Sequence, residues 1–121
     1  MTAPRPTRRE TGRRGEELAA RWYLARGYEV LDRNWCCREG EIDLVARSQT
    51  TLVFCEVKAR SSDRFGTGLE SVPPGKRRRL RRLAGRWLAA GGARRVAGAP
   101  EVRFDVASLT DGVLEVVEAA F

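Results

Sequence analysis

The chain is short of the residues on which several classes of protein depend. Its 121 residues include no histidine and three cysteines, of which Cys36 and Cys37 are adjacent. This spacing fits neither a disulfide framework nor a zinc site. No segment approaches the roughly 20 consecutive apolar residues that a membrane span needs, and residues 1–14 lack the apolar core of a signal peptide. We therefore expect a cytoplasmic protein with reduced cysteines and no membrane partner.

Lysine is scarce as well, because only Lys58 and Lys76 among the 23 basic residues are lysines. An ammonium is a compact charge whose pKa the surroundings can tune, whereas a guanidinium is a planar fork that stays protonated. Lys58 follows Glu56 by two positions in the strand-like segment 51–58, so both side chains face the same way. We interpret Glu56 and Lys58 as candidate site residues.

What the chain has in excess is positive charge, and that charge is unevenly placed. The formal net charge is +7, yet residues 76–95 hold nine basic residues and no acid, while residues 101–121 hold five acids and one arginine. Such asymmetry suits a polyanion bound on one side. An arginine-rich proteome would raise the isoelectric point in the same way, and composition alone does not separate the two explanations.

The length and a hydrophobic content of 42% predict one domain with its own core. We assign residues 1–10 to a flexible basic segment and residues 11–121 to this domain. Periodicity and turn residues predict a helix at 11–26, strands at 28–35, 40–47 and 51–58, a helix from Pro73-Pro74 to about residue 90, and strands at 102–109 and 113–119. The first three strands are expected to form a meander.

The second and third strands can be aligned by arithmetic. If their loop is centred on Gln49-Thr50, residues whose numbers sum to 99 lie opposite each other. Asp43 then opposes Glu56, and Glu41 opposes Lys58. Opposed carboxylates repel unless a cation or a proton lies between them, and hard oxygen ligands favour Mg²⁺ or Mn²⁺. The alternative is that Glu41 and Lys58 form an ordinary surface ion pair.

These residues carry a resemblance to a known family. Asp43, twelve intervening residues and then Glu56-Val57-Lys58 resemble the bipartite motif of PD-(D/E)XK nucleases. From Gly12 onward the chain looks closer still to the YraN-like family of bacterial endonuclease-like proteins. The segments that carry this likeness are 12–20 (GRRGEELAA), 33–35 (RNW), 40–46 (GEIDLVA), 54–60 (FCEVKAR), 76–80 (KRRRL) and 103–106 (RFDV).

The resemblance implies an α/β fold with a restriction-endonuclease-like αβββαβ core, in which two main helices flank a mixed five-stranded sheet. It implies that Asp43 and Glu56 are ligands of Mg²⁺ or Mn²⁺, with the Val57 carbonyl as a further ligand. Lys58 would be the catalytic lysine that orients the attacking water and stabilises charge on the phosphate. Glu16, the acid of the first helix, would be a second catalytic residue that holds a second metal or a bridging water. Helical periodicity also favours Glu16 over Glu17, because Glu16 lies nearer the apolar stripe. The alternative for Glu16 is a simple partner of the helix dipole.

A basic surface is predicted on the second helix, on the side away from its apolar stripe. Its candidate phosphate contacts, with two arginines that are close to the site in sequence, are Arg78, Arg79, Arg82, Arg86, Arg60 and Arg64. For each arginine a merely solvated surface is the alternative. No helix-turn-helix or zinc-finger motif is present, so we expect salt-sensitive binding with little sequence specificity.

Two functions follow from this pattern. The first is a metal-dependent endonuclease that hydrolyses phosphodiester bonds of nucleic acid, with DNA favoured over RNA and branched or structured DNA as a candidate substrate. A homodimer with two sites would suit a branched substrate. The second is a non-catalytic nucleic-acid-binding or interaction module on the same fold, in which the acids only stabilise the structure.

Overall fold

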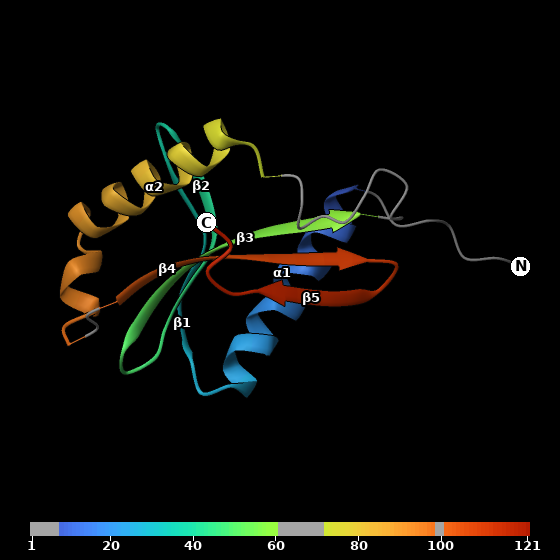
Figure 1. Ribbon diagram of the computed structural model, residues 1–121, viewed down its shortest axis with the longest axis horizontal. Coiled ribbons are helices and arrows are strands. Elements are labelled where there is room, and N and C mark those ends of the chain that lie inside the picture. The colour runs from blue at the N-terminus through green and yellow to red at the C-terminus, as the bar shows by residue number, and fades with distance from the viewer. Residues whose placement is uncertain (1–7, 61–71, 99–100) are drawn as a thin grey trace, which may run out of the picture.

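The computed structural model describes residues 8–60, 72–98 and 101–121 (Figure 1). Its elements are α1 (Arg8–Ala25), β1 (Glu29–Cys37), β2 (Gly40–Arg47), β3 (Thr51–Arg60), α2 (Pro74–Ala89), the short 3-10 helix η2 (Gly92–Arg95), β4 (Glu101–Thr110) and β5 (Val113–Val117). Every predicted helix and strand is present. The first helix begins at Arg8 rather than near Thr11, and η2 was not predicted because four residues are too few to show a period.

The five strands form one sheet in the order of the sequence. β1, β2 and β3 make the predicted antiparallel meander, β3 and β4 run parallel with α2 between them, and β5 returns antiparallel to β4. The turn before β5 is the predicted Asp111-Gly112, and both residues have positive φ, which a tight two-residue hairpin turn requires. The sheet is therefore mixed, and the predicted restriction-endonuclease-like α/β core is confirmed.

The helices cover opposite faces of this sheet (Figure 1). On one face α1 contributes Ala19, Ala20 and Tyr23 to a buried cluster, and on the other face α2 contributes Leu83, Ala84 and Trp87. β3 serves both clusters by strict alternation, because Val53 and Cys55 lie under α1 whereas Leu52 and Phe54 lie under α2. β3 is therefore the central strand, buried on both faces.

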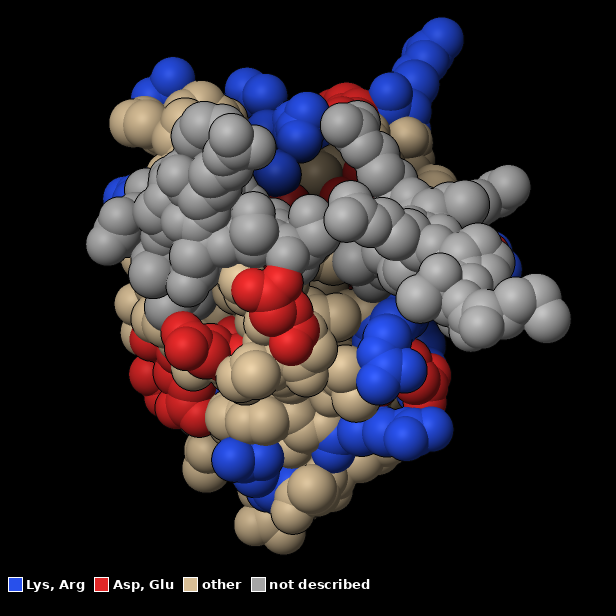
Figure 2. Space-filling model, turned by 90° about the vertical axis from the view of Figure 1, so that its right-hand side faces the viewer, with Lys and Arg blue, Asp and Glu red and all other residues tan. Residues whose placement is uncertain are grey.

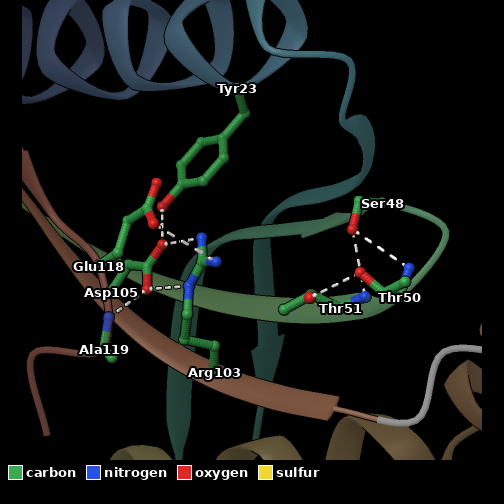
Figure 3. A network of polar contacts seen from close by, with 8 residues as sticks. All are labelled: Tyr23, Ser48, Thr50, Thr51, Arg103, Asp105, Glu118 and Ala119. Atoms are coloured by element: carbon green, nitrogen blue, oxygen red, sulfur yellow. Dashed lines mark hydrogen bonds and ion pairs between the residues drawn. The ribbon is translucent and has the colours of Figure 1, made fainter.

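A buried carboxylate joins α1, β4 and the C-terminal segment (Figure 3). Asp105 has no exposed surface. Its two oxygens accept hydrogen bonds from the Tyr23 hydroxyl at 2.6 Å, from two guanidinium nitrogens of Arg103 at 2.8 and 2.9 Å, and from the Ala119 backbone N–H at 2.9 Å. A buried carboxylate is tolerated when its lone pairs are satisfied in this way. Asp105 is thus a structural anchor.

Within the described residues, no helix combines the length and the apolar character that crossing a membrane would require.

The packing at the end of α2 yields a first prediction. A Cβ at Gly92 would lie well inside van der Waals contact of the buried Trp87 indole, whereas a Cβ at Gly85, on the exposed side of α2, would meet nothing within 4 Å. Gly92→Ala should lower the free energy of unfolding by about 1–3 kcal/mol because the site becomes overpacked. Gly85→Ala should raise it by about 0.5–1 kcal/mol because alanine favours the helix. Denaturant titration of both variants checks this pair, and equal effects would contradict it.

The Asp105 network yields a second prediction. Tyr23→Phe removes one donor from a fully buried carboxylate and should lower the free energy of unfolding by about 1.5–3 kcal/mol, the usual value of a hydrogen bond to a charged group. Tyr28→Phe removes the same hydroxyl from a partly exposed ring and should cost less. Thermal unfolding of the two variants measures the difference, and a Tyr23→Phe protein as stable as the wild type would refute the anchoring role of Asp105.

Candidate functional site

The candidate site lies where β2 separates from β3. The predicted register is correct, since Leu44, Val45, Ala46 and Arg47 pair with partners at the predicted sum of 99. The ladder nevertheless ends at Leu44 and Cys55, so the expected direct pairs of Asp43 with Glu56 and of Glu41 with Lys58 lie beyond it. β3 itself continues to Arg60 in contact with β4 on its other side. A gap therefore opens along one edge of β3.

Asp43 fills the start of this gap. Its Oδ2 accepts a hydrogen bond of 2.8 Å from the Val57 backbone N–H, which would otherwise have paired with a backbone carbonyl of β2. Burial, followed by the charge of Glu56, raises the pKa of the Asp43 carboxyl to about 7, against the lowering effect of the Val57 hydrogen bond. Glu16 and Glu41 raise the pKa of Asp43 as well. Acids from α1, β2 and β3 thus converge on one carboxylate.

Glu16 is held in place by a residue that the sequence analysis did not single out. The Asn34 side-chain amide donates to Glu16 Oε2 at 2.8 Å, and Asn34 has the positive φ of 51° that asparagine tolerates better than most residues. The neighbouring Glu17 instead forms ion pairs with Arg21 and Arg33, which lower the pKa of its carboxyl, with Arg33 as the main cause. Charge neutralisation of Glu17 leaves Glu16 as the acid of α1 that acts on Asp43.

Two amines belong to the opposite side of the site. Lys58 lies two residues after Glu56 on β3, so both side chains project from the face of the strand that α2 covers. Lys76, near the start of α2, places its Nζ 2.6 Å from Glu56 Oε1. Sequence reasoning missed Lys76, although the signal was available: the scarcity of lysine that drew attention to Lys58 applies equally to Lys76.

One buried hydroxyl lies on the same face of the sheet as Lys58. Ser108 on β4 is the register partner of Lys58, and it is 4% exposed. Its Oγ has no hydrogen-bond partner within the described ranges. Unsatisfied buried groups are rare in folded proteins and are often found at functional sites. Ser108 therefore adds a free acceptor beside the position of Lys58.

The arginines of α2 divide into two groups. Arg78, Arg79 and Arg82 are exposed, as predicted from the buried stripe of Leu80, Leu83 and Trp87. Arg86 is also exposed, but its Nε pairs with Glu39 at 2.8 Å.

The other two arginines of this helix form cation–π contacts with aromatic rings. Arg81 lies over the rings of Phe104 and Phe121, and Arg77 lies over Phe121. Of the remaining candidates, Arg60 ends β3 with a side chain that is not described, and Arg64 lies outside the described residues.

Seen from the end at which β3 and β4 finish, acidic atoms lie inside a recess and basic atoms lie beside them (Figure 2). Within residues 8–60, 72–98 and 101–121, no three histidine, cysteine or acidic side chains are already gathered as a metal site. The centre of the candidate site is the carboxylate pair of Asp43 and Glu56. Glu16 adds negative charge near Asp43, and Lys76 forms an ion pair with Glu56.

Comparison with known proteins places this chain in a family. The model of the group described as "Uncharacterised protein family UPF0102" matches residues 15–109, a range that contains every residue named above for the site. Among the relatives, a UPF0102 protein of Frankia alni is 55% identical over 95 residues, which cover 78% of this chain and 76% of the relative. A UPF0102 protein of Acidothermus cellulolyticus is 46% identical over the full length of both chains. The chain therefore belongs to the UPF0102 family, the YraN-like family that its sequence motifs resemble.

Proposed function

We propose that this protein is a divalent-metal-dependent endonuclease that hydrolyses phosphodiester bonds of DNA. The observation that carries the proposal is the position of Asp43, a carboxylate set in the gap between β2 and β3 beside Glu56. A carboxylate that only stabilises a fold is surrounded by donors, as Asp105 is. Asp43 has one backbone donor and acidic neighbours, an arrangement that suits cation binding rather than stability.

The donor set fits Mg²⁺ or Mn²⁺. Magnesium in enzymes is held by one or two carboxylates together with waters and substrate phosphate oxygens, and Asp43 and Glu56 supply that number. The Val57 carbonyl faces the same gap as its N–H, because both groups of one strand residue point toward the same neighbouring strand. A bound ion would activate a water and neutralise charge on the phosphate.

The remaining site residues have separate parts in this proposal. The Lys58 ammonium can hold a phosphate oxygen and stabilise the negative charge that grows as water attacks phosphorus and the bond to the leaving oxygen breaks. Glu16, fixed by Asn34, supplies an acceptor for a water on the α1 side of Asp43. The attacking water releases one proton to solvent, and the departing oxygen takes one proton from solvent or from a bound water.

The exposed face of α2 supplies affinity for the substrate. Arg78, Arg79 and Arg82 follow Lys76 on one helix. The sugar-phosphate backbone of a nucleic acid bound at the candidate site could therefore extend along them. Contacts of this kind are salt-sensitive and carry no sequence information. They support DNA as a substrate and also support the second candidate function, a binding module that does not cleave. The acidic neighbours of Asp43 favour the nuclease.

Asp43→Asn tests the catalytic proposal directly. The asparagine oxygen can still accept the Val57 hydrogen bond, but the charge is lost. We expect Mn²⁺ binding, measured by calorimetry, to weaken at least about tenfold, which corresponds to about 1.4 kcal/mol. Metal-dependent cleavage of duplex, single-stranded or four-way-junction DNA, or of RNA, should fall at least about a hundredfold, as for the loss of a metal ligand or its orienting partner.

The matched control is Asp111→Asn, at an exposed turn with a φ of 49° that asparagine also adopts. This variant should bind metal and cleave like the wild type. Salt-sensitive DNA binding by a wild-type protein that binds no metal would contradict the nuclease and support the binding module.

The raised pKa of Asp43 predicts how stability depends on pH without metal. An unfolded aspartate has a pKa of about 3.9, while the folded value is about 7. The folded protein thus holds a proton that the unfolded chain has lost. The stability linked to this proton is complete below pH 4 and is lost as the pH rises through 7. Asp43→Asn should therefore gain stability relative to the wild type between pH 5 and pH 8, by at least about 3 °C in Tm. Calorimetric scans in a chelator measure this, and a pH-independent difference would speak against a partly buried Asp43 among acidic neighbours.

A further inference from the structure

Lys76 lies in the N-terminal turn of α2, a position that disfavours a positive charge. It lies in the first turn of α2, which begins at Pro74, has no acidic residue and has no side-chain cap. The N-terminal end of a helix carries partial positive charge, so a lysine there is repelled by the helix dipole. A compensating interaction must hold the ammonium, and the contact with Glu56 provides it.

The contact is close and largely shielded from water. Lys76 Nζ lies 2.6 Å from Glu56 Oε1, and the exposed fractions of the two side chains are 31% and 12%. A buried carboxylate needs a partner of opposite charge, and Glu56 has the acidic Asp43 as a neighbour. In this structure Lys76 supplies positive charge to the acid that the proposed function assigns to the metal.

A divalent ion at the Glu56 carboxylate would compete with the Lys76 ammonium, because two cations held at one carboxylate repel each other. We propose that Lys76 is an exchangeable internal cation: it holds Glu56 in the metal-free protein, is displaced when Mg²⁺ or Mn²⁺ binds, and then turns its ammonium to a phosphate oxygen of the nucleic-acid backbone. This inference rests on the proposed function and makes Lys76 a second catalytic lysine beside Lys58. The position of Lys76 at the start of the helix that carries Arg78, Arg79 and Arg82 gives the released amine the same direction as these phosphate contacts.

The rarity of lysine makes the proposal easy to test on the unaltered protein. Reductive methylation with formaldehyde, read by mass spectrometry of peptides, reports on Lys58, Lys76 and the N-terminal amine alone. We expect Lys76 to react slowly in a chelator, severalfold faster in saturating Mg²⁺, and slowly again when duplex DNA is added with Ca²⁺ in place of Mg²⁺ to prevent cleavage. Asp43→Asn in Mg²⁺ is the control and should keep Lys76 slow.

The outcomes separate this inference from the proposed function. Calorimetry that detects no metal binding overturns both. Metal binding with no change in the reactivity of Lys76 overturns the exchange alone. Release by metal without renewed protection by DNA overturns the contact with phosphate and keeps the exchange.

Substitution of Lys76 gives an independent measurement. Lys76→Met removes the competing cation, so Mn²⁺ should bind at least about tenfold more tightly, the lower end of the range for one hydrogen bond to a charged group. Lys76→Arg keeps a cation and should retain an affinity near that of the wild type. If Lys76 only supports the fold, a folded Lys76→Met protein, checked by circular dichroism, would bind Mn²⁺ equally or more weakly, and that result would overturn the proposal.

Discussion

The hydrogen bond from the Val57 N–H to the Asp43 carboxylate is the interaction on which the site depends. It lets residues 40–43 of β2 separate from β3 without leaving the partly buried Val57 N–H unpaired. If the ladder had continued, the edge of β3 at Val57 would be closed by backbone. Because a side chain completes the bonding instead, the gap accommodates the Asp43 carboxylate beside Glu56 of β3. Sheet geometry and site chemistry are therefore set by one contact.

Two aspartates in this protein differ in how their carboxylate charge is compensated. Asp105 has no exposed surface and accepts from Tyr23, Arg103 and Ala119, so its charge is matched and it ties α1 and the C-terminal segment to β4. Asp43 receives one backbone hydrogen bond and stands among acids, so burial raises its pKa to about 7. The fold tolerates the second arrangement because the first stabilises the same sheet. A carboxylate whose pKa is shifted in this way is typical of functional sites.

The two faces of the sheet carry different kinds of side-chain contact. On the α1 face, Asn34 and Glu16 approach Asp43 while Glu17 is neutralised by arginines. On the α2 face, Arg77 and Arg81 pack on aromatic rings and so fasten the C-terminal Phe121 over Phe104, whereas other arginines of the helix remain exposed. The basic helix thus stabilises the fold with one part of its charge and leaves another part exposed to solvent. The ion pair of Glu56 with Lys76 links the acidic residues of the site to the basic helix α2.

The sequence by itself determined the elements, the meander, the register of β2 with β3 and the family, because periodicity, turn residues and contiguous motifs are local. It also pointed to Asp43, Glu56 and Lys58 through spacing and through the rarity of lysine. It did not predict that the ladder ends at Leu44, nor that Asn34 holds Glu16, nor that Lys76 reaches Glu56. Those contacts join segments 18 to 20 positions apart in the chain, from Asn34 with Glu16 to Lys76 with Glu56. Only the packing of α1 and α2 on opposite faces of the sheet brings such segments together, and that packing follows from burial of whole surfaces rather than from any one motif.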